Sequence, residues 1–128
     1  MARVVFFFQR GEYEAVHQGL SAAAAACALG DSCELYFFWH GLGRLVKGPL
    51  DAPEGEALAD HLEARGVPSL EELLTAVRGS GQARLLACSG SLAALGLKPA
   101  DVESHVDELI GWTGILTRTR GVVDRYFF

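Results

Sequence analysis

The chain has 128 residues, of which 50% are hydrophobic and 21% are charged. This length is typical of one domain, and this composition excludes an intrinsically disordered chain. The 11 Lys and Arg residues against 16 Asp and Glu residues give a net charge of −5. We expect a single domain over residues 1–128. Because contacts with phosphate groups need a positive surface, we expect that this domain binds no nucleic acid.

Two observations on the sequence argue against a membrane or secreted protein. It has no run of about 18 apolar residues, the length that a transmembrane helix needs. Its beginning, MARVVFFFQRG, is shorter than a signal peptide and has no small-residue cleavage site. We therefore expect a cytoplasmic protein that does not contact a membrane.

The first part of the chain predicts a β-α-β unit. Residues 3–8 (RVVFFF) are β-branched and aromatic, which is typical of a strand buried on both faces. An alanine-rich helix is expected over residues 13–29 and ends at Gly30. A second apolar strand covers residues 33–39. Residues 40–48 form a glycine-rich connection with room for a short helical turn.

The middle of the chain predicts two helices and a third strand. One helix is expected over residues 54–65. The other covers residues 69–78, where Ser69 and Glu72 have the spacing of a capping box. The short apolar segment 83–87 (ARLLA) is expected to be the third strand.

The last part of the chain continues this alternation. Residues 88–91 predict a turn of small residues, followed by a helix over 92–95. A fourth strand is expected over 106–110, a helix over 112–120 and a last strand over 122–128. Strands that alternate with helices indicate a three-layer α/β/α fold, a small Rossmann-like domain with a mainly parallel five-stranded sheet.

In such a sheet the ligand site lies outside the carboxyl ends of the strands. Cys88 is the reactive group that this rule selects, since it follows the third strand and precedes a helix. The N-terminus of a helix favours the thiolate, and the backbone N–H groups of Ser89, Gly90 and Ser91 can approach the sulfur. The alternative interpretation is a small apolar cysteine that is packed and inert.

The other strand ends supply the expected lining of the pocket. The candidates are Gln9, Trp39, His40, Gly41 and Trp112. A histidine here can act as a base or as a cation beside a thiolate, or it can be an exposed loop residue. The glycines after the second strand allow a turn, and they match no phosphate-binding motif.

The remaining cysteines and histidines predict no further site. Cys27 lies on the apolar side of the alanine-rich helix, and Cys33 begins a strand at the opposite end of the sheet. The three cysteines form no C-x-x-C pair, and no two histidines have metal-ligand spacing. We expect neither a metal nor a cofactor.

Several segments in order resemble the DsrE/DsrF-like (DsrEFH, TusD-like) sulfur-relay family. The segment LLACSGSLAALGL resembles the family's strand, cysteine and helix around Cys88. A loop ending in E-x-E, the alanine-rich helix and GDSCELYFF resemble its first β-α-β unit. The family's second strand and the apolar glycine loop after it are similar to FFWHGLGRLVKGP. Its last β-α-β unit is similar to VDELIGWTGIL and VVDRYFF.

This resemblance implies a three-layer fold and assembly into oligomers, often trimers or hexamers. It also implies that Cys88 accepts sulfane sulfur as a persulfide and exchanges it with donor and acceptor proteins. The hypothesis is therefore a sulfur carrier or sulfurtransferase-like protein. One alternative is a non-catalytic oligomeric module that binds a small ligand in the same crevice. A second alternative is a nucleotide-binding subunit that uses residues 40–48.

Overall fold

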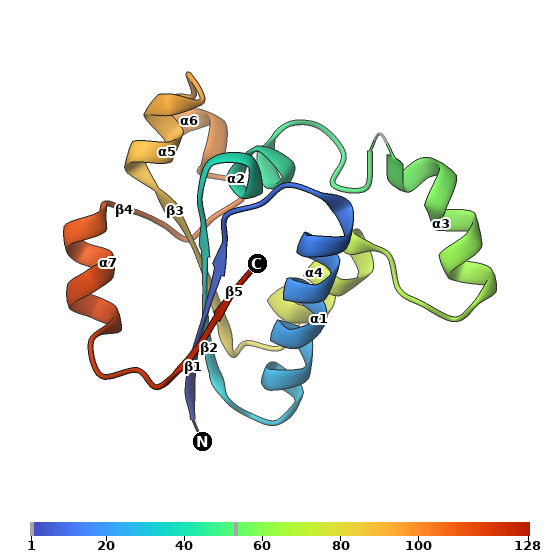
Figure 1. The fold of residues 1–128 in the computed structure, drawn as a ribbon, viewed down its shortest axis with the longest axis horizontal. Helices are drawn as coiled ribbons and strands as arrows, with labels where there is room; N and C mark the ends of the chain where they lie inside the picture. Colours follow the sequence, from blue (N-terminus) through green and yellow to red (C-terminus); the bar gives the residue numbers. More distant parts are fainter. Residues whose placement is uncertain (1, 53) are drawn as a thin grey trace.

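The computed structural model describes residues 2–52 and 54–128, with the backbone alone at 54–57 and 59, and shows one sheet between two layers of helices (Figure 1). All strand pairs are parallel, in the order β4-β3-β2-β1-β5. The strands are β1 (Arg3–Phe8), β2 (Ser32–Phe37), β3 (Ala83–Cys88), β4 (Glu108–Ile110) and β5 (Asp124–Phe127). The parallel α/β fold predicted from the sequence is thus confirmed.

The helices cover both faces of this sheet. They are α1 (Tyr13–Ala28), α2 (Trp39–Val46), α3 (Glu54–Ala64), α4 (Leu70–Gly79), α5 (Ser89–Ala94), α6 (Pro99–Val102) and α7 (Trp112–Thr119). In Figure 1 the helix α7 lies on one side of the sheet, and α1 and α4 lie on the other. Among the described residues, no helix is both long enough and apolar enough to cross a bilayer.

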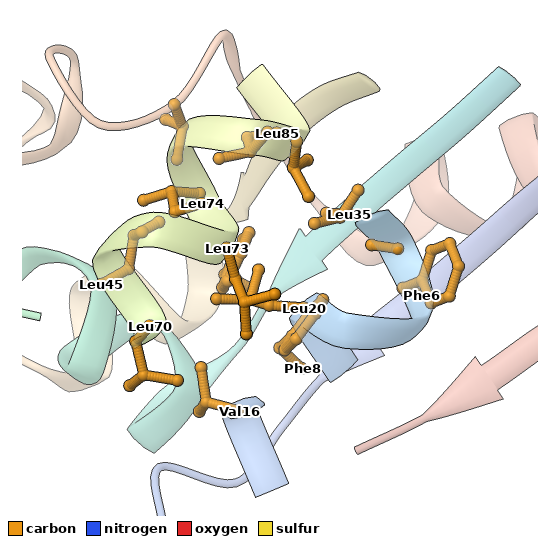
Figure 2. Close-up of a cluster of buried hydrophobic side chains, with 14 of the residues drawn as sticks. Phe6, Phe8, Val16, Leu20, Leu35, Leu45, Leu70, Leu73, Leu74 and Leu85 are labelled. Atoms are coloured by element: carbon orange, nitrogen blue, oxygen red, sulfur yellow. The ribbon is translucent and has the colours of Figure 1, made fainter. Parts of the chain in front are cut away.

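The alternation of side chains along β1 divides the interior into two cores. Phe6 and Phe8 point toward α1 and α4, into the larger core that Figure 2 shows with Leu20 and Leu35. Phe7 points to the opposite face, into a smaller core that includes Ile115 of α7. Burial of one such side chain stabilises the fold by about 1.5–3 kcal/mol. The smaller core is the one that contains Cys88.

Two sequence signals for helix ends agree with the structure. Gly30, which follows the C-cap residue Leu29 of α1, adopts a positive φ of 84°, a conformation that costs glycine little. Ser69 and Glu72 form the predicted capping box at the start of α4.

The connection expected over residues 40–48 is largely a helix, because α2 covers Trp39–Val46. Leu42 and Leu45, three residues apart, are both buried and hold this segment in helical form against the cost of its glycines.

Other boundaries differ from the prediction as well: β2 ends at Phe37 rather than at residue 39, and β5 covers Asp124–Phe127 rather than residues 122–128. The helix α5 begins at Ser89 rather than at residue 92, because the extended backbone of Cys88 already forms its N-cap. The strand β4 covers only three residues, because the N–H of Val106 donates to the carbonyl of Val102 in the turn after α6.

A cluster of charged side chains connects α7 to the sheet. The Arg3 guanidinium donates to Glu34 Oε2 at 2.6 Å and to the carbonyl of Arg118 at 2.7 Å. Tyr36, which is buried, donates its hydroxyl to Glu34. Arg118 donates to Glu108 at 2.7 Å, which links the end of α7 to β4. The cluster thereby fixes the helix whose first residue is Trp112.

This cluster predicts a loss of stability in acid. Burial alone would raise the pKa of Glu34, but the hydrogen bonds from Arg3 and Tyr36 outweigh it and hold the pKa below its ordinary value. Its contribution is therefore present above the unfolded value of about 4.3 and lost as the pH falls through the lower folded value. We expect Glu34→Gln to lower the free energy of unfolding by about 1–2 kcal/mol at neutral pH.

Urea unfolding of Glu34→Gln and the native protein as a function of pH checks this prediction. The difference between the two proteins should shrink as the pH falls below about 4, because the native carboxyl then becomes protonated as well. A difference that stays constant over the acid range would show that the charge of Glu34 is not what stabilises the cluster.

Candidate functional site

A cavity of about 500 Å³ lies at the carboxyl ends of the strands. It is open to solvent on one side and has the size of a small-molecule site. The side chains and backbone that line it come from the segments after β1 and β2, from the end of β3 and from the beginnings of α5 and α7. These residues are Gln9, Phe38, Trp39, Cys88, Gly90, Ser91 and Trp112.

Cys88 is the nucleophilic group of this cavity. It is the last residue of β3, on the face of the sheet that α7 covers. Its sulfur is turned toward the first turn of α5, since a Cβ at Gly90 would lie 3.8 Å from Cys88 Sγ. Cys88 is only 3% exposed, because side chains of the smaller core surround it. A reactant therefore has to enter the cavity to reach the sulfur.

Aromatic rings form the walls of the cavity. The ring of Phe38 stacks on that of Trp112, with 4.9 Å between the centroids and 20° between the planes. Phe38 is buried, whereas Trp39 is 54% exposed and Trp112 is 47% exposed. The two tryptophans thus stand at the solvent side, and Phe38 and Cys88 lie deeper. This arrangement suits a flat or apolar group that slides between the rings toward the sulfur.

The backbone at Trp39 is strained. Its φ of 40° is the only positive value among the non-glycine residues that the structure describes. The segment before α1 packs closely beside it, because a Cβ at Gly11 would lie 2.6 Å from the carbonyl oxygen of His40. Strained residues are typical of functional sites, where the surrounding structure holds them in place.

A pair of variants separates this strain from the loss of the indole. We expect Trp39→Gly to be more stable than Trp39→Ala by about 1 kcal/mol, because only glycine adopts a positive φ without a clash of its Cβ. Both variants remove the same exposed ring, so the ring cancels in the comparison. Urea unfolding of the two proteins measures the difference. An alanine variant as stable as the glycine variant would show that position 39 carries no such strain.

The cavity contains six of the nine residues that the sequence singled out, and it leaves out three. His40 lines a second cavity of about 380 Å³, together with Glu12, Arg44 and Lys47. Gly41 is buried against β1, where a Cβ would lie 2.3 Å from the carbonyl oxygen of Phe8.

Ser89, the third of these residues, is exposed, and its Oγ faces Gly111. The sequence also missed a residue, because Phe38 lines the cavity. Its signal was the alternation along β2, which places Phe38 on the same face as Tyr36.

The other two cysteines do not line this cavity. Cys27 is 6% exposed and Cys33 is 1% exposed, and both belong to the larger core. Burial raises the pKa of Cys33 to about 12, and the neighbouring Cys27 adds to that shift. The Cys33 thiol is therefore a poor nucleophile near neutral pH, since the thiolate is the reactive form.

The chain matches no protein-family model, and no curated protein matches it significantly. Its similarity to solved structures is extensive. The MTH1491 protein of Methanobacterium thermoautotrophicum, described as a protein of unknown function, is 20% identical with a TM-score of 0.63, over 98% of this chain and 97% of that one. The ychN protein of E. coli is 12% identical with a TM-score of 0.71, over the whole of both chains. At these identities the similarity shows a shared fold.

Proposed function

We propose that this protein is a sulfur carrier of the sulfurtransferase type, in which Cys88 accepts sulfane sulfur as a persulfide. The observation that carries the proposal is a cysteine sulfur at the inner end of a ligand-sized cavity, at the carboxyl end of a parallel strand. The resemblance of LLACSGSLAALGL to the DsrE/DsrF-like family supports the same assignment.

The chemistry requires one thiolate and no cofactor. The Cys88 thiolate attacks the outer sulfur of a donor persulfide R–S–SH, the donor's S–S bond breaks, and R–S⁻ leaves with the bonding electron pair. The product is Cys88–S–SH. An acceptor thiolate then attacks that outer sulfur, and Cys88 leaves as the thiolate. Donor and acceptor are proteins or small thiols that reach the cavity of a protein we propose to be cytoplasmic.

Local groups support both the thiolate and the persulfide. The backbone N–H groups of Ser89, Gly90 and Ser91 belong to the first turn of α5, where a helix provides no acceptor for them, so they can approach the sulfur. The net charge of −5 acts in the opposite direction, but dipoles within a few ångströms outweigh surface charges that salt screens. The position of Cys88 inside the cavity also restricts a bound persulfide to reactants that enter the cavity.

The second candidate is a module that binds a small ligand without covalent chemistry. The burial of Cys88 favours it, because a 3% exposed thiol meets few reagents. In that case the aromatic rings would hold the ligand and the sulfur would only contact it. The two candidates differ in whether a covalent sulfur adduct forms on Cys88.

We also propose that the chain forms a homo-oligomer, a trimer or hexamer as the family resemblance implies. The edge strand β5 carries Tyr126 and Phe127, which are 48% and 62% exposed. Leu116 on α7 and Val123 before β5 are exposed as well. A monomer would leave these apolar side chains in water. Light scattering should therefore give a molecular mass several times that of one chain. A mass of one chain at both low and high protein concentration would contradict the assembly.

The test of the proposed function is incubation with a sulfane-sulfur donor, followed by mass spectrometry of the peptides. We expect the mass of one added sulfur atom on the Cys88 peptide, in the native protein and in Cys33→Ser. Cys88→Ser should show no addition, with its fold checked by circular dichroism. Sulfur on Cys27 or Cys33, or no addition to any peptide, would refute the proposal in favour of the binding module.

A further inference from the structure

The lining of the cavity specifies the charge of the donor. We infer that the cavity selects a persulfide whose substituent is aromatic or apolar and uncharged, and disfavours donors with a further anionic group, such as thiosulfate. This inference rests on the proposed function, because it names the class of molecule that would deliver sulfur to Cys88. It concerns the group R in R–S–SH, whereas the proposed function concerns the sulfur that is transferred.

The first support is the composition of the walls. Three aromatic side chains, Phe38, Trp39 and Trp112, line the cavity. Phe38 and Trp112 already stack on each other, and the partly exposed faces of the two tryptophans remain accessible to a ligand. Rings of this kind bind flat apolar groups by offset stacking and burial. A cavity of about 500 Å³ accommodates one such ring together with a persulfide.

The second support is the absence of a countercharge. Among the residues that the structure describes, the lining contains no charged side chain, and its polar side chains are those of Gln9 and Ser91. A carboxylate or sulfonate brought between the aromatic rings would lose water without gaining an ion pair, which is costly. The net charge of −5 disfavours the approach of an anion further.

The second cavity shows the contrast within the same molecule. It is lined by the basic side chains His40, Arg44 and Lys47, besides Glu12. Cys88 is not part of that lining. Arg44 and Lys47 therefore line a different cavity from the one that contains the sulfur. A donor held by them would not present its persulfide to Cys88.

Two donors that differ by one carboxylate test the inference. Benzyl persulfide and 4-carboxybenzyl persulfide share the ring and the reacting S–S bond, and each would transfer its outer sulfur to Cys88 and leave as the thiolate. The rate at which each donor loads Cys88 is divided by the rate at which the same donor reacts with a free small thiol. We expect this relative rate to be at least about tenfold higher for benzyl persulfide than for 4-carboxybenzyl persulfide. Equal relative rates would overturn the inference and leave the proposed function standing.

Binding of unreactive analogues tests the same selectivity without sulfur transfer. The two tryptophans of the chain, Trp39 and Trp112, both line this cavity, so intrinsic fluorescence reports its occupation. Titrations followed by this fluorescence should give benzyl methyl sulfide a dissociation constant at least about tenfold lower than that of its 4-carboxylate. Tighter binding of benzyl methyl sulfide, together with no sulfur loading of Cys88, would refute the proposed function alone. Equal affinities of the two compounds, or no binding of either, would overturn the inference.

A positive charge placed in the lining should remove most of the preference for the donor without the carboxylate. Gln9→Arg puts a cation at the exposed edge of the cavity and should raise the relative rate with the carboxylate donor about tenfold. Gln18→Arg is the matched control, because Gln18 is an exposed residue of α1 outside the cavity. It makes the same change in net charge and should leave the ratio of the two donors unchanged. The same shift in both variants would contradict recognition by the lining.

Discussion

Gly41→Ala should lower the free energy of unfolding by about 3 kcal/mol. The added Cβ would lie 2.3 Å from the carbonyl oxygen of Phe8, a backbone atom at the end of β1 that is held in place by the hydrogen bond it accepts from the N–H of Phe38. To relieve this contact, the start of α2 would have to move off the end of β1. That movement would displace Trp39 and open the cavity, so the variant should also bind benzyl methyl sulfide more weakly.

Gly43→Ala is the matched control in the same helix. A Cβ at Gly43 meets nothing within 4 Å, so the substitution adds no contact. Alanine is the better helix former by about 1 kcal/mol, and we expect this variant to be as stable as the native protein or more stable. Urea unfolding followed by circular dichroism measures both proteins. Equal losses in the two variants would show that the close packing at Gly41 does not position α2.

Gly90→Val should slow sulfur loading of Cys88 about a hundredfold, without unfolding the protein. Its Cβ would lie 3.8 Å from Cys88 Sγ, and the two methyl groups beyond it would occupy space that an incoming persulfide needs. A displacement of about 1 Å between reacting atoms is enough for an effect of this size. Gly90 is exposed, and valine is no worse a helix former than glycine, so stability should be retained.

Gly79→Val makes the same substitution at the end of α4, where an added Cβ meets nothing within 4 Å. This control should load sulfur at the native rate. The rates come from peptide mass spectrometry at successive times with one donor. Loading of Gly90→Val at the rate of Gly79→Val would show that the donor does not approach the sulfur past the first turn of α5.

The fold was predictable because its signals are local. The run RVVFFF has no helical period and became β1 with the expected bounds, and Ser69 with Glu72 capped α4 as the spacing indicated. The connection after β2 was harder to predict, because its glycines argue against a helix. Burial of Leu42 and Leu45 decides the outcome there, and that burial depends on tertiary contacts that the local sequence does not contain.

The site was predictable in position and less so in exposure. The rule for strand ends brought Gln9, Cys88 and Trp112 to one cavity, although they are far apart in the sequence. The same rule placed His40 there too, but the helical turn that begins at Trp39 directs His40 into the second cavity. The burial of Cys88 depends on the packing of α7 over the sheet, which periodicity along one segment does not reveal.

The central claim is that Cys88 is the reactive thiol, and competitive alkylation of the native protein tests it most directly. A small reagent such as iodoacetamide is applied near neutral pH, and the modification of each cysteine is followed by peptide mass. All three cysteines are buried, but Cys88 should react first, because it lines a cavity that opens to solvent, whereas Cys27 and Cys33 lie in the larger core. Faster reaction at Cys27 or Cys33, or reaction of Cys88 only after unfolding, would contradict the account.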